Sequence, residues 1–174
     1  MAKKRMAVMK MKLMSIDSST KATGCAVFID GKYHSHTLLD FSKEKNVDER
    51  MDKMILTLLL HIDKEKPNMV SIEQPKGSPN PELVRKLSEI LGAVRGYCLM
   101  YDITYMEVMP SQWRKWLPDY NQGGKRRDEL KQLSIDYVKE HLGLVVQDDE
   151  ADSINQGLGV INYLDSLDED ELFE

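Results

Sequence analysis

The chain has 174 residues, of which 41% are hydrophobic and 30% are charged, and this balance is typical of one soluble globular domain. Its net charge of −5 counts against a nucleic-acid partner, but six acids lie in residues 165–174, and without them the net charge becomes +1. No segment has the roughly 20 consecutive apolar residues of a membrane helix, and the basic start lacks the apolar core of a signal peptide, so we expect no membrane partner.

The first half of the chain alternates between predicted strands and a predicted helix. Asp30-Gly31 stands between two apolar runs and is a strong signal for a two-residue hairpin turn. Residues 47–62 repeat apolar side chains at helical spacing, whereas the run "MVSIE" is typical of a central strand buried on both faces. We therefore predict strands over 11–17, 24–30, 32–41 and 68–74, and a helix over 47–62.

Helices dominate the second half. Asn80-Pro81 is a start signal for a helix that continues to residue 101, and a further strand is predicted over 103–109. The stretch "SQWRKWL" is expected to form one or two helical turns, in which Trp113 and Trp116 pack against the domain rather than stack on bases.

Two longer helices complete the predicted order. The first covers 125–142 and ends at Gly143, which suits the left-handed backbone that follows a helix, and the second begins with Asp148 as its N-cap. This order predicts an α/β domain. Its central mixed five-stranded sheet would combine a three-stranded antiparallel edge with parallel strands, flanked by helices.

Basic residues gather in two clusters, Lys3-Lys4-Arg5 near the start and Lys125-Arg126-Arg127 at the penultimate helix. A nearly neutral body with basic patches is compatible with DNA as a partner. Cations at a helix start oppose the helix dipole, and a DNA phosphate would offset that cost. The two cysteines, Cys25 and Cys98, lie inside apolar patterns, which favours buried thiols in a reducing cytoplasm.

Four carboxylates interrupt apolar patterns. Asp17 and Glu73 end two predicted strands, and the carboxyl ends of strands are where open α/β sheets place their ligands. Asp149 and Asp152 are three residues apart on one helical face, where like charges repel unless a cation lies between them. Asp17 and Glu73 also have structural interpretations. Asp17 can form a turn, and Glu73 can pair with a buried Arg or Lys.

Carboxylate clusters of this kind hold divalent metals that activate water and stabilise the leaving oxygen of a phosphodiester. Magnesium prefers such hard oxygen ligands. The letters "DEAD" at 149–152 do not indicate a helicase, because the chain contains no phosphate-binding loop of that class. The neighbours Asp148 and Glu150 are accounted for by capping and by the helix dipole.

The order of four short motifs resembles the RuvC family of Holliday-junction resolvases, which have an RNase H-like fold. The motifs are "MSIDSSTKATGCAVF", "VSIEQP", "LSEILGAVRG" and "DDEADSINQGLG", and the resemblance covers roughly residues 9–165. It implies an RNase H-like nuclease domain over 9–165, with a basic segment over 1–8 and an acidic tail over 166–174.

The resemblance also implies the site and its partners. The metal-binding and catalytic carboxylates fall on Asp17, Glu73, Asp149 and Asp152, which would hold two Mg²⁺ ions per active site, with Mn²⁺ as a substitute. Lys125 is the expected basic catalytic residue. The partners implied are a second copy of the chain, in a homodimer, and branched DNA, namely four-way junctions and also Y-forks and flaps. The expected DNA-binding residues are Lys76, Lys125, Arg126 and Arg127.

The loop after Glu73 reads "QPKGSPNP" and lacks the aromatic residue with which cellular members of the family wedge a junction open. Together with the basic start and the acidic tail, this looks more like the bacteriophage branch, which would place the protein in the host cytoplasm. Two alternatives stay open. One is a branched-DNA-binding protein with weak catalysis, and the other is an RNase H-like nuclease that acts on RNA.

Overall fold

The computed structural model describes residues 11–75 and 80–167. Its ten elements alternate in the predicted order along the chain. They are β1 (Lys12–Asp17), β2 (Ala22–Ile29), β3 (Lys32–Asp40), α1 (Val47–Glu65), β4 (Met69–Glu73), α2 (Pro81–Met100), β5 (Thr104–Val108), α3 (Pro110–Trp116), α4 (Arg127–Leu142) and α5 (Asp148–Ser166).

The five strands form one sheet in the order β3-β2-β1-β4-β5. The β1–β2 and β2–β3 pairs are antiparallel, whereas β1–β4 and β4–β5 are parallel. The predicted mixed sheet with a three-stranded antiparallel edge is therefore confirmed. Asp30 and Gly31 both have positive φ angles, of 51° and 75°, and form the turn between β2 and β3, as a two-residue hairpin requires.

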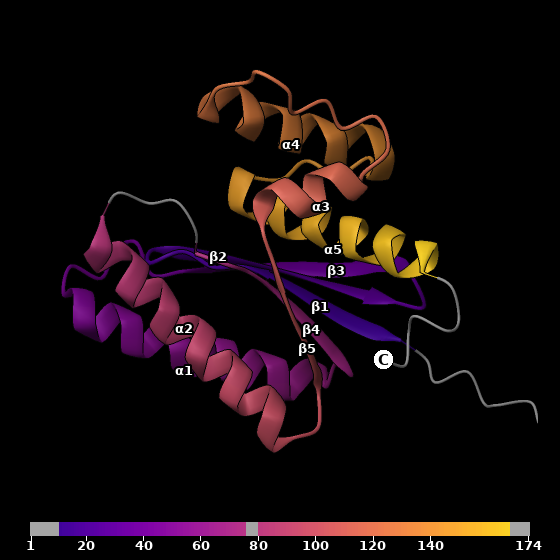
Figure 1. Ribbon diagram of the computed structural model, residues 1–174. Coiled ribbons are helices and arrows are strands. Elements are labelled where there is room, and N and C mark those ends of the chain that lie inside the picture. The colour runs from indigo at the N-terminus through magenta and orange to yellow at the C-terminus, as the bar shows by residue number, and fades with distance from the viewer. Residues whose placement is uncertain (1–10, 76–79, 168–174) are drawn as a thin grey trace, which may run out of the picture.

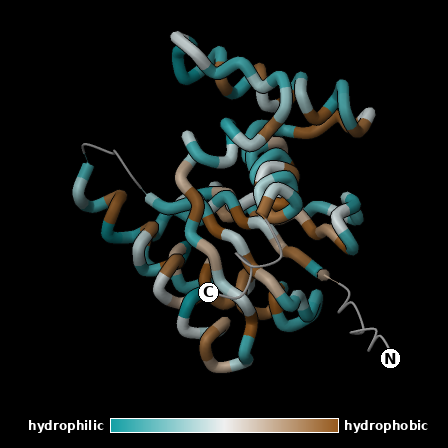
Figure 2. The backbone as a smooth tube through the Cα atoms, turned by 45° about the vertical axis from the view of Figure 1, so that its right-hand side comes forward, coloured by the Kyte–Doolittle hydropathy of each residue, from teal (hydrophilic) through white to brown (hydrophobic). Residues whose placement is uncertain are grey.

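Helices cover both faces of the sheet (Figure 1). α1 and α2 lie together on one face of the sheet. α5 crosses the other face, and α3 and α4 pack against α5. Strand residues alternate between two apolar cores: Leu13 and Phe28 pack towards α5, and Met14 and Ile16 pack towards α1 and α2. Figure 2 shows hydrophobic stretches along the strands in the middle of the molecule. None of the described helices is long and apolar enough to cross a membrane.

A close approach of backbone to backbone fixes the start of α5 on the sheet. A Cβ atom added to Gly24 of β2 would lie 2.0 Å from the carbonyl oxygen of Asp149, so only glycine fits there. Nearby, the Ser15 hydroxyl of β1 donates to the carbonyl oxygen of Ser153 at 2.6 Å. These contacts hold the first turns of α5 against β1 and β2.

Two local predictions change in detail. The N-cap of α5 is Gln147, so Asp148 is the first helical residue and the prediction of Asp148 as N-cap is wrong by one position. α4 begins at Arg127 rather than at residue 125. The side chain of Glu150 explains the first shift, because it accepts a hydrogen bond from the backbone N–H of Gln147 at 2.9 Å.

Candidate active site

Five of the predicted site residues, the four carboxylates and Arg127, line a single cavity of about 700 Å³ at the carboxyl ends of β1 and β4. We call it the carboxylate pocket. Ile16 of β1 pairs with Ile72 of β4 in parallel register, so the next residues, Asp17 and Glu73, end adjacent strands side by side. The first turns of α5 contribute Asp148, Asp149 and Asp152 to the same pocket. The charged side chains that line the pocket are Asp17, Glu73, Asp148, Asp149, Asp152, Lys21, Arg114, Arg127 and Lys131.

Asp17 and Glu73 lie in an environment that is unfavourable for negative charge. Burial is the main cause that raises the pKa of Asp17 well above its usual value, and the charges of Glu73, Asp152 and Asp149 raise it further. Burial also raises the pKa of Glu73 to about 7, although a hydrogen bond from Trp113 acts in the opposite direction. Clustered carboxyls with raised pKa values are typical of functional sites.

Asp148 differs from its two neighbours in the pocket. Its carboxylate accepts a hydrogen bond from the Lys131 ammonium of α4, and this bond lowers the pKa of Asp148. Burial instead raises the pKa of Asp149 and of Asp152. Lys131 thus balances the charge of Asp148, whereas a bound cation would stabilise the charged forms of Asp149 and Asp152.

A chain of side chains from α4 and α5 orients Asp152. The Ser134 hydroxyl donates a hydrogen bond to Asp152 Oδ1, and the Asn155 amide donates to Ser134 Oγ at 2.8 Å and to its carbonyl oxygen at 2.9 Å. Ser134 and Asn155 are both fully buried. Because the Asn155 amide occupies the acceptor side of the Ser134 hydroxyl, its proton is directed at the Asp152 carboxylate.

Sequence reasoning missed two residues of α3 at the pocket. Trp113 is fully buried, as predicted for packing, but its indole N–H also donates to Glu73 Oε2 at 3.1 Å. The guanidinium of Arg114 lies 4.0 Å from Asp152 Oδ2, and its charge lowers the pKa values of Asp17, Glu73 and Asp152. Among the described residues no Arg or Lys forms an ion pair with Glu73: Arg114 pairs with Asp152 and acts on Glu73 through its charge alone.

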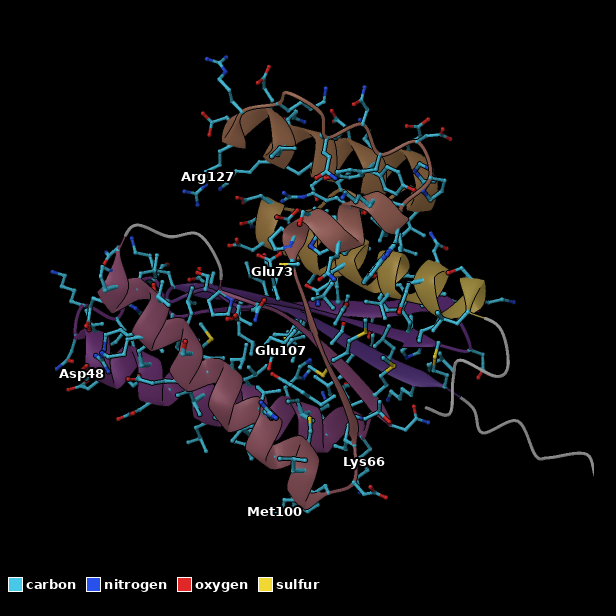
Figure 3. The ribbon with its side chains drawn as sticks, in the orientation of Figure 1. Asp48, Lys66, Glu73, Met100, Glu107 and Arg127 are labelled. Atoms are coloured by element: carbon cyan, nitrogen blue, oxygen red, sulfur yellow. The ribbon has the colours of Figure 1, made fainter. Side chains whose placement is uncertain are left out.

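The predicted basic residues divide into two groups. Arg127, the first residue of α4, lines the pocket. Figure 3 shows Arg127 higher in the view than Glu73, which lies below α3. Lys125 and Arg126 are not among the lining residues, and Arg126 pairs with Glu129 at 3.3 Å. Lys131, one helical turn beyond Arg127, also lines the pocket, which the sequence did not predict. Lys76 lies outside the described residues.

The donor set fits a divalent metal. Carboxylate oxygens are the ligands that Mg²⁺ prefers. A cation would offset the burial and the mutual repulsion that raise the pKa values of Asp17 and Glu73. Within residues 11–75 and 80–167, no group of three or more His, Cys, Asp or Glu side chains is drawn together as a ready-made metal cage. The residues available as ligands are Asp17, Glu73, Asp149 and Asp152.

No protein-family model matches the chain, and neither does any curated protein. Among solved structures, RuvC of Thermus thermophilus in complex with a Holliday junction substrate is similar, with a TM-score of 0.68 at 18% identity over 89% of this chain and 96% of that chain. The yeast mitochondrial Holliday junction resolvase Ydc2 has a TM-score of 0.59 at 15% identity, over 88% of this chain and 78% of that chain.

A second Thermus thermophilus RuvC structure aligns with a TM-score of 0.67 at 20% identity and with the same coverage of 89% and 96%. Identities this low show a shared fold. The predicted RNase H-like architecture is thereby confirmed for the part of the chain that the structure describes.

Proposed function

We propose that the protein is a divalent-metal-dependent, structure-selective endodeoxyribonuclease that resolves Holliday junctions by paired nicks. The observation that carries the proposal is the carboxylate pocket, in which Asp17, Glu73, Asp149 and Asp152 meet beside the cations Arg114, Arg127 and Lys131. Acids alone would repel DNA, whereas acids beside cations can hold both metal ions and a phosphodiester. The shared fold with two junction resolvases adds support.

The pocket residues have distinct tasks in this reaction. Asp17, Glu73, Asp149 and Asp152 would hold two Mg²⁺ ions, or Mn²⁺ in their place. When bound, such ions supply charge stabilisation to the phosphate and generate the nucleophile from water. Arg114, beside Asp152, orients the scissile phosphate and balances the charge that develops on it. Trp113 and Ser134 are positioning residues, because each directs one donor at a metal-binding carboxylate.

The basic residues of α4 bind the DNA backbone. Arg127 and Lys131 are assigned to phosphates at the pocket, which they line. Lys125 and Arg126, whose positions are outside the lining, are assigned to phosphates further along the same strand. Lys76, predicted from the loop after Glu73, extends this set. Each contact with a phosphate adds affinity that falls as the salt concentration rises.

Paired nicks require two active sites, so the proposal includes a homodimer. α2 offers a surface for a second copy: Leu99 and Met100 are 73% and 75% exposed. Gly92 and Gly96 of the same helix have no atom within 4 Å of an added Cβ, so another helix could approach closely. A twofold interface would bury this apolar surface. Sedimentation of a monomer at micromolar concentration would contradict the dimer.

The resemblance of the sequence to the bacteriophage branch extends the proposal to Y-forks and flaps as further substrates. One gel tests the whole proposal: cleavage of a four-way junction, a Y-fork, a duplex and an RNA–DNA hybrid, each with Mg²⁺ and with EDTA. We expect Mg²⁺-dependent cutting of the junction and the fork. Binding without cutting would favour a branched-DNA-binding protein, and preferred cutting of the hybrid would favour an RNA-directed nuclease.

A further inference from the structure

A second cavity, of about 420 Å³, lies beside the carboxylate pocket and shares Arg114 with it. We call it the loop pocket, because most of its lining comes from the connection between α3 and α4. It is a shallow hollow, wide open to solvent, so it can take part of an extended strand rather than enclose a free small molecule. The lining residues are Arg114, Lys115, Leu117, Asp119, Tyr120, Asn121 and Gln122.

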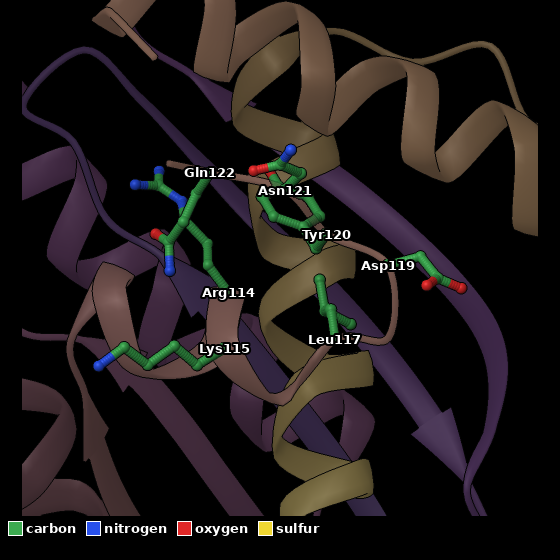
Figure 4. A pocket seen from close by; sticks show the side chains of 7 residues that line it. All are labelled: Arg114, Lys115, Leu117, Asp119, Tyr120, Asn121 and Gln122. Carbon is green, nitrogen blue, oxygen red and sulfur yellow. The ribbon is translucent and has the colours of Figure 1, made fainter. Parts of the chain in front are cut away.

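The side chains of the loop pocket match the parts of a nucleotide. Lys115 and Arg114 supply cations for a phosphate, and the amides of Asn121 and Gln122 can pair with the edge of a base. Leu117 and Tyr120 also line the pocket, but they are only 5% and 6% exposed, so they offer the base or the sugar little apolar surface. In Figure 4 the carboxylate of Asp119 extends away from Arg114 and Lys115, so the acid does not cancel these cations.

The position of Arg114 links the two cavities. Its guanidinium lies 4.0 Å from Asp152 in the carboxylate pocket, while the same residue lines the loop pocket. Successive phosphates of one strand follow each other closely, by about 3.4 Å along the helix axis. A strand whose scissile phosphate lies at the carboxylates therefore brings its next nucleotides to the loop pocket.

From these observations we propose that the loop pocket is a nucleotide subsite for the cut strand, next to the scissile phosphate. Lys115 contacts the phosphate of that nucleotide, and Gln122 and Asn121 contact its base. The inference rests on the proposed function, and it adds a residue-level source of preference for the position of the cut. The ligand class is a single nucleotide within DNA, held by its phosphate and its base edge.

Single-turnover cutting of a fixed four-way junction tests the subsite. An abasic site replaces, one at a time, each of the three nucleotides on either side of the cut. For the unaltered protein we expect about tenfold slower cutting at one of these positions, as for the loss of one good base contact. Gln122→Ala should slow cutting of the intact junction by a similar factor, and the abasic site at that position should then have no further effect.

Two control variants accompany this test. Gln132→Ala removes an exposed amide on the outer side of α4 and should keep the abasic profile of the unaltered protein. Lys115→Ala should weaken junction binding and reduce the slope of log affinity against log salt by about one, whereas Lys139→Ala should leave the slope unchanged.

The outcomes separate the subsite from the function on which it rests. If the unaltered protein cuts no junction, the proposed function fails and the subsite fails with it. If the protein cuts but no abasic position matters, or if Gln122→Ala retains the original abasic profile, the subsite alone is wrong.

Discussion

The indole nitrogen of Trp113 lies 3.1 Å from Oε2 of Glu73 and donates a hydrogen bond to it. The bond joins α3 to the end of β4, and it comes from a side chain that is fully buried. A neutral donor lowers the pKa of Glu73 without neutralising its charge. The carboxylate is therefore held in place while it keeps its capacity to bind a cation.

The raised pKa of Glu73 predicts how the metal-free protein responds to pH. The pKa is raised from 4.5 to about 7, so the folded protein binds the proton of Glu73 more tightly than the unfolded chain does. The free energy of unfolding that this proton contributes is complete below about pH 4.5 and is lost as the pH rises through 7. At about 1.4 kcal/mol for each pKa unit, this amounts to roughly 3 kcal/mol. Urea unfolding in EDTA at several pH values measures it.

Two variants serve as controls for this prediction. Glu73→Gln should reduce the loss of stability between pH 4.5 and 7 by the contribution of Glu73, while the raised pKa values of Asp17, Asp149 and Asp152 maintain the rest. Trp113→Phe should move the contribution of Glu73 to higher pH, because the hydrogen bond that lowers its pKa is gone. An unaltered protein that follows the same pH curve as Glu73→Gln would contradict the assignment.

Asp17→Asn should abolish cutting and leave junction binding largely intact. The substitution removes a metal-binding carboxylate but none of the cations that would bind DNA. It should also stabilise the metal-free protein near pH 8, because burial and neighbouring acids disfavour the charge at this position. Cleavage, fluorescence anisotropy and thermal unfolding measure the three effects. Asp52→Asn, at an exposed position of α1, is the matched control. Retained cutting would show that Asp17 is not a metal ligand.

Ser134→Ala should weaken metal binding by about 10- to 100-fold, as is usual when a side chain that orients a ligand is lost. The variant frees Asp152 Oδ1 and also leaves the Asn155 amide without the Ser134 hydroxyl. Mn²⁺ binding by electron paramagnetic resonance reports the affinity independently of cleavage. Ser166→Ala, at the far end of α5, should bind Mn²⁺ like the unaltered protein. Equal affinity for both variants would show that Ser134 is only part of the packing.

Comparing Arg114→Ala with Lys125→Ala tests which basic side chain acts on the scissile phosphate. We expect Arg114→Ala to slow single-turnover cutting by roughly 100- to 1,000-fold, the usual loss for one electrostatic donor in an active site. Lys125→Ala, outside the pocket lining, should mainly weaken binding. Thermal unfolding of both variants excludes a general loss of folding. A larger loss of rate for Lys125→Ala would restore the assignment made from the sequence.

Gly24→Ala should reduce both stability and metal affinity. Its new Cβ would overlap the carbonyl oxygen of Asp149, so the first turn of α5 must move away from β2. Overpacking of this kind typically costs about 1–3 kcal/mol. Gly123→Ala is the control, because its added Cβ makes only an ordinary contact of 3.5 Å with Asn121 Oδ1. Unchanged Mn²⁺ affinity in Gly24→Ala would mean that this contact does not position Asp149.

The sequence predicted those parts of the site that depend on local pattern. Asp17 and Glu73 end apolar runs, and parallel strands bring their carboxyl ends together, so their proximity in the structure follows from the element order. Asp149 and Asp152 share a helical face by spacing alone, and both line the pocket. The mixed sheet likewise follows from the hairpin signal at Asp30-Gly31 and from the alternation of strands and helices.

Tertiary packing alone decided which polar side chains of α3 and α4 meet these carboxylates. Arg114, Lys131 and Ser134 carry no local signal, because the side of a helix that faces its neighbour depends on how α3 and α4 pack against α5. Lys125 and Lys131 are equally basic in the sequence, yet only Lys131 lines the pocket. The charge of a residue is local information, whereas the direction in which a helix presents it is set by contacts between residues far apart in the chain.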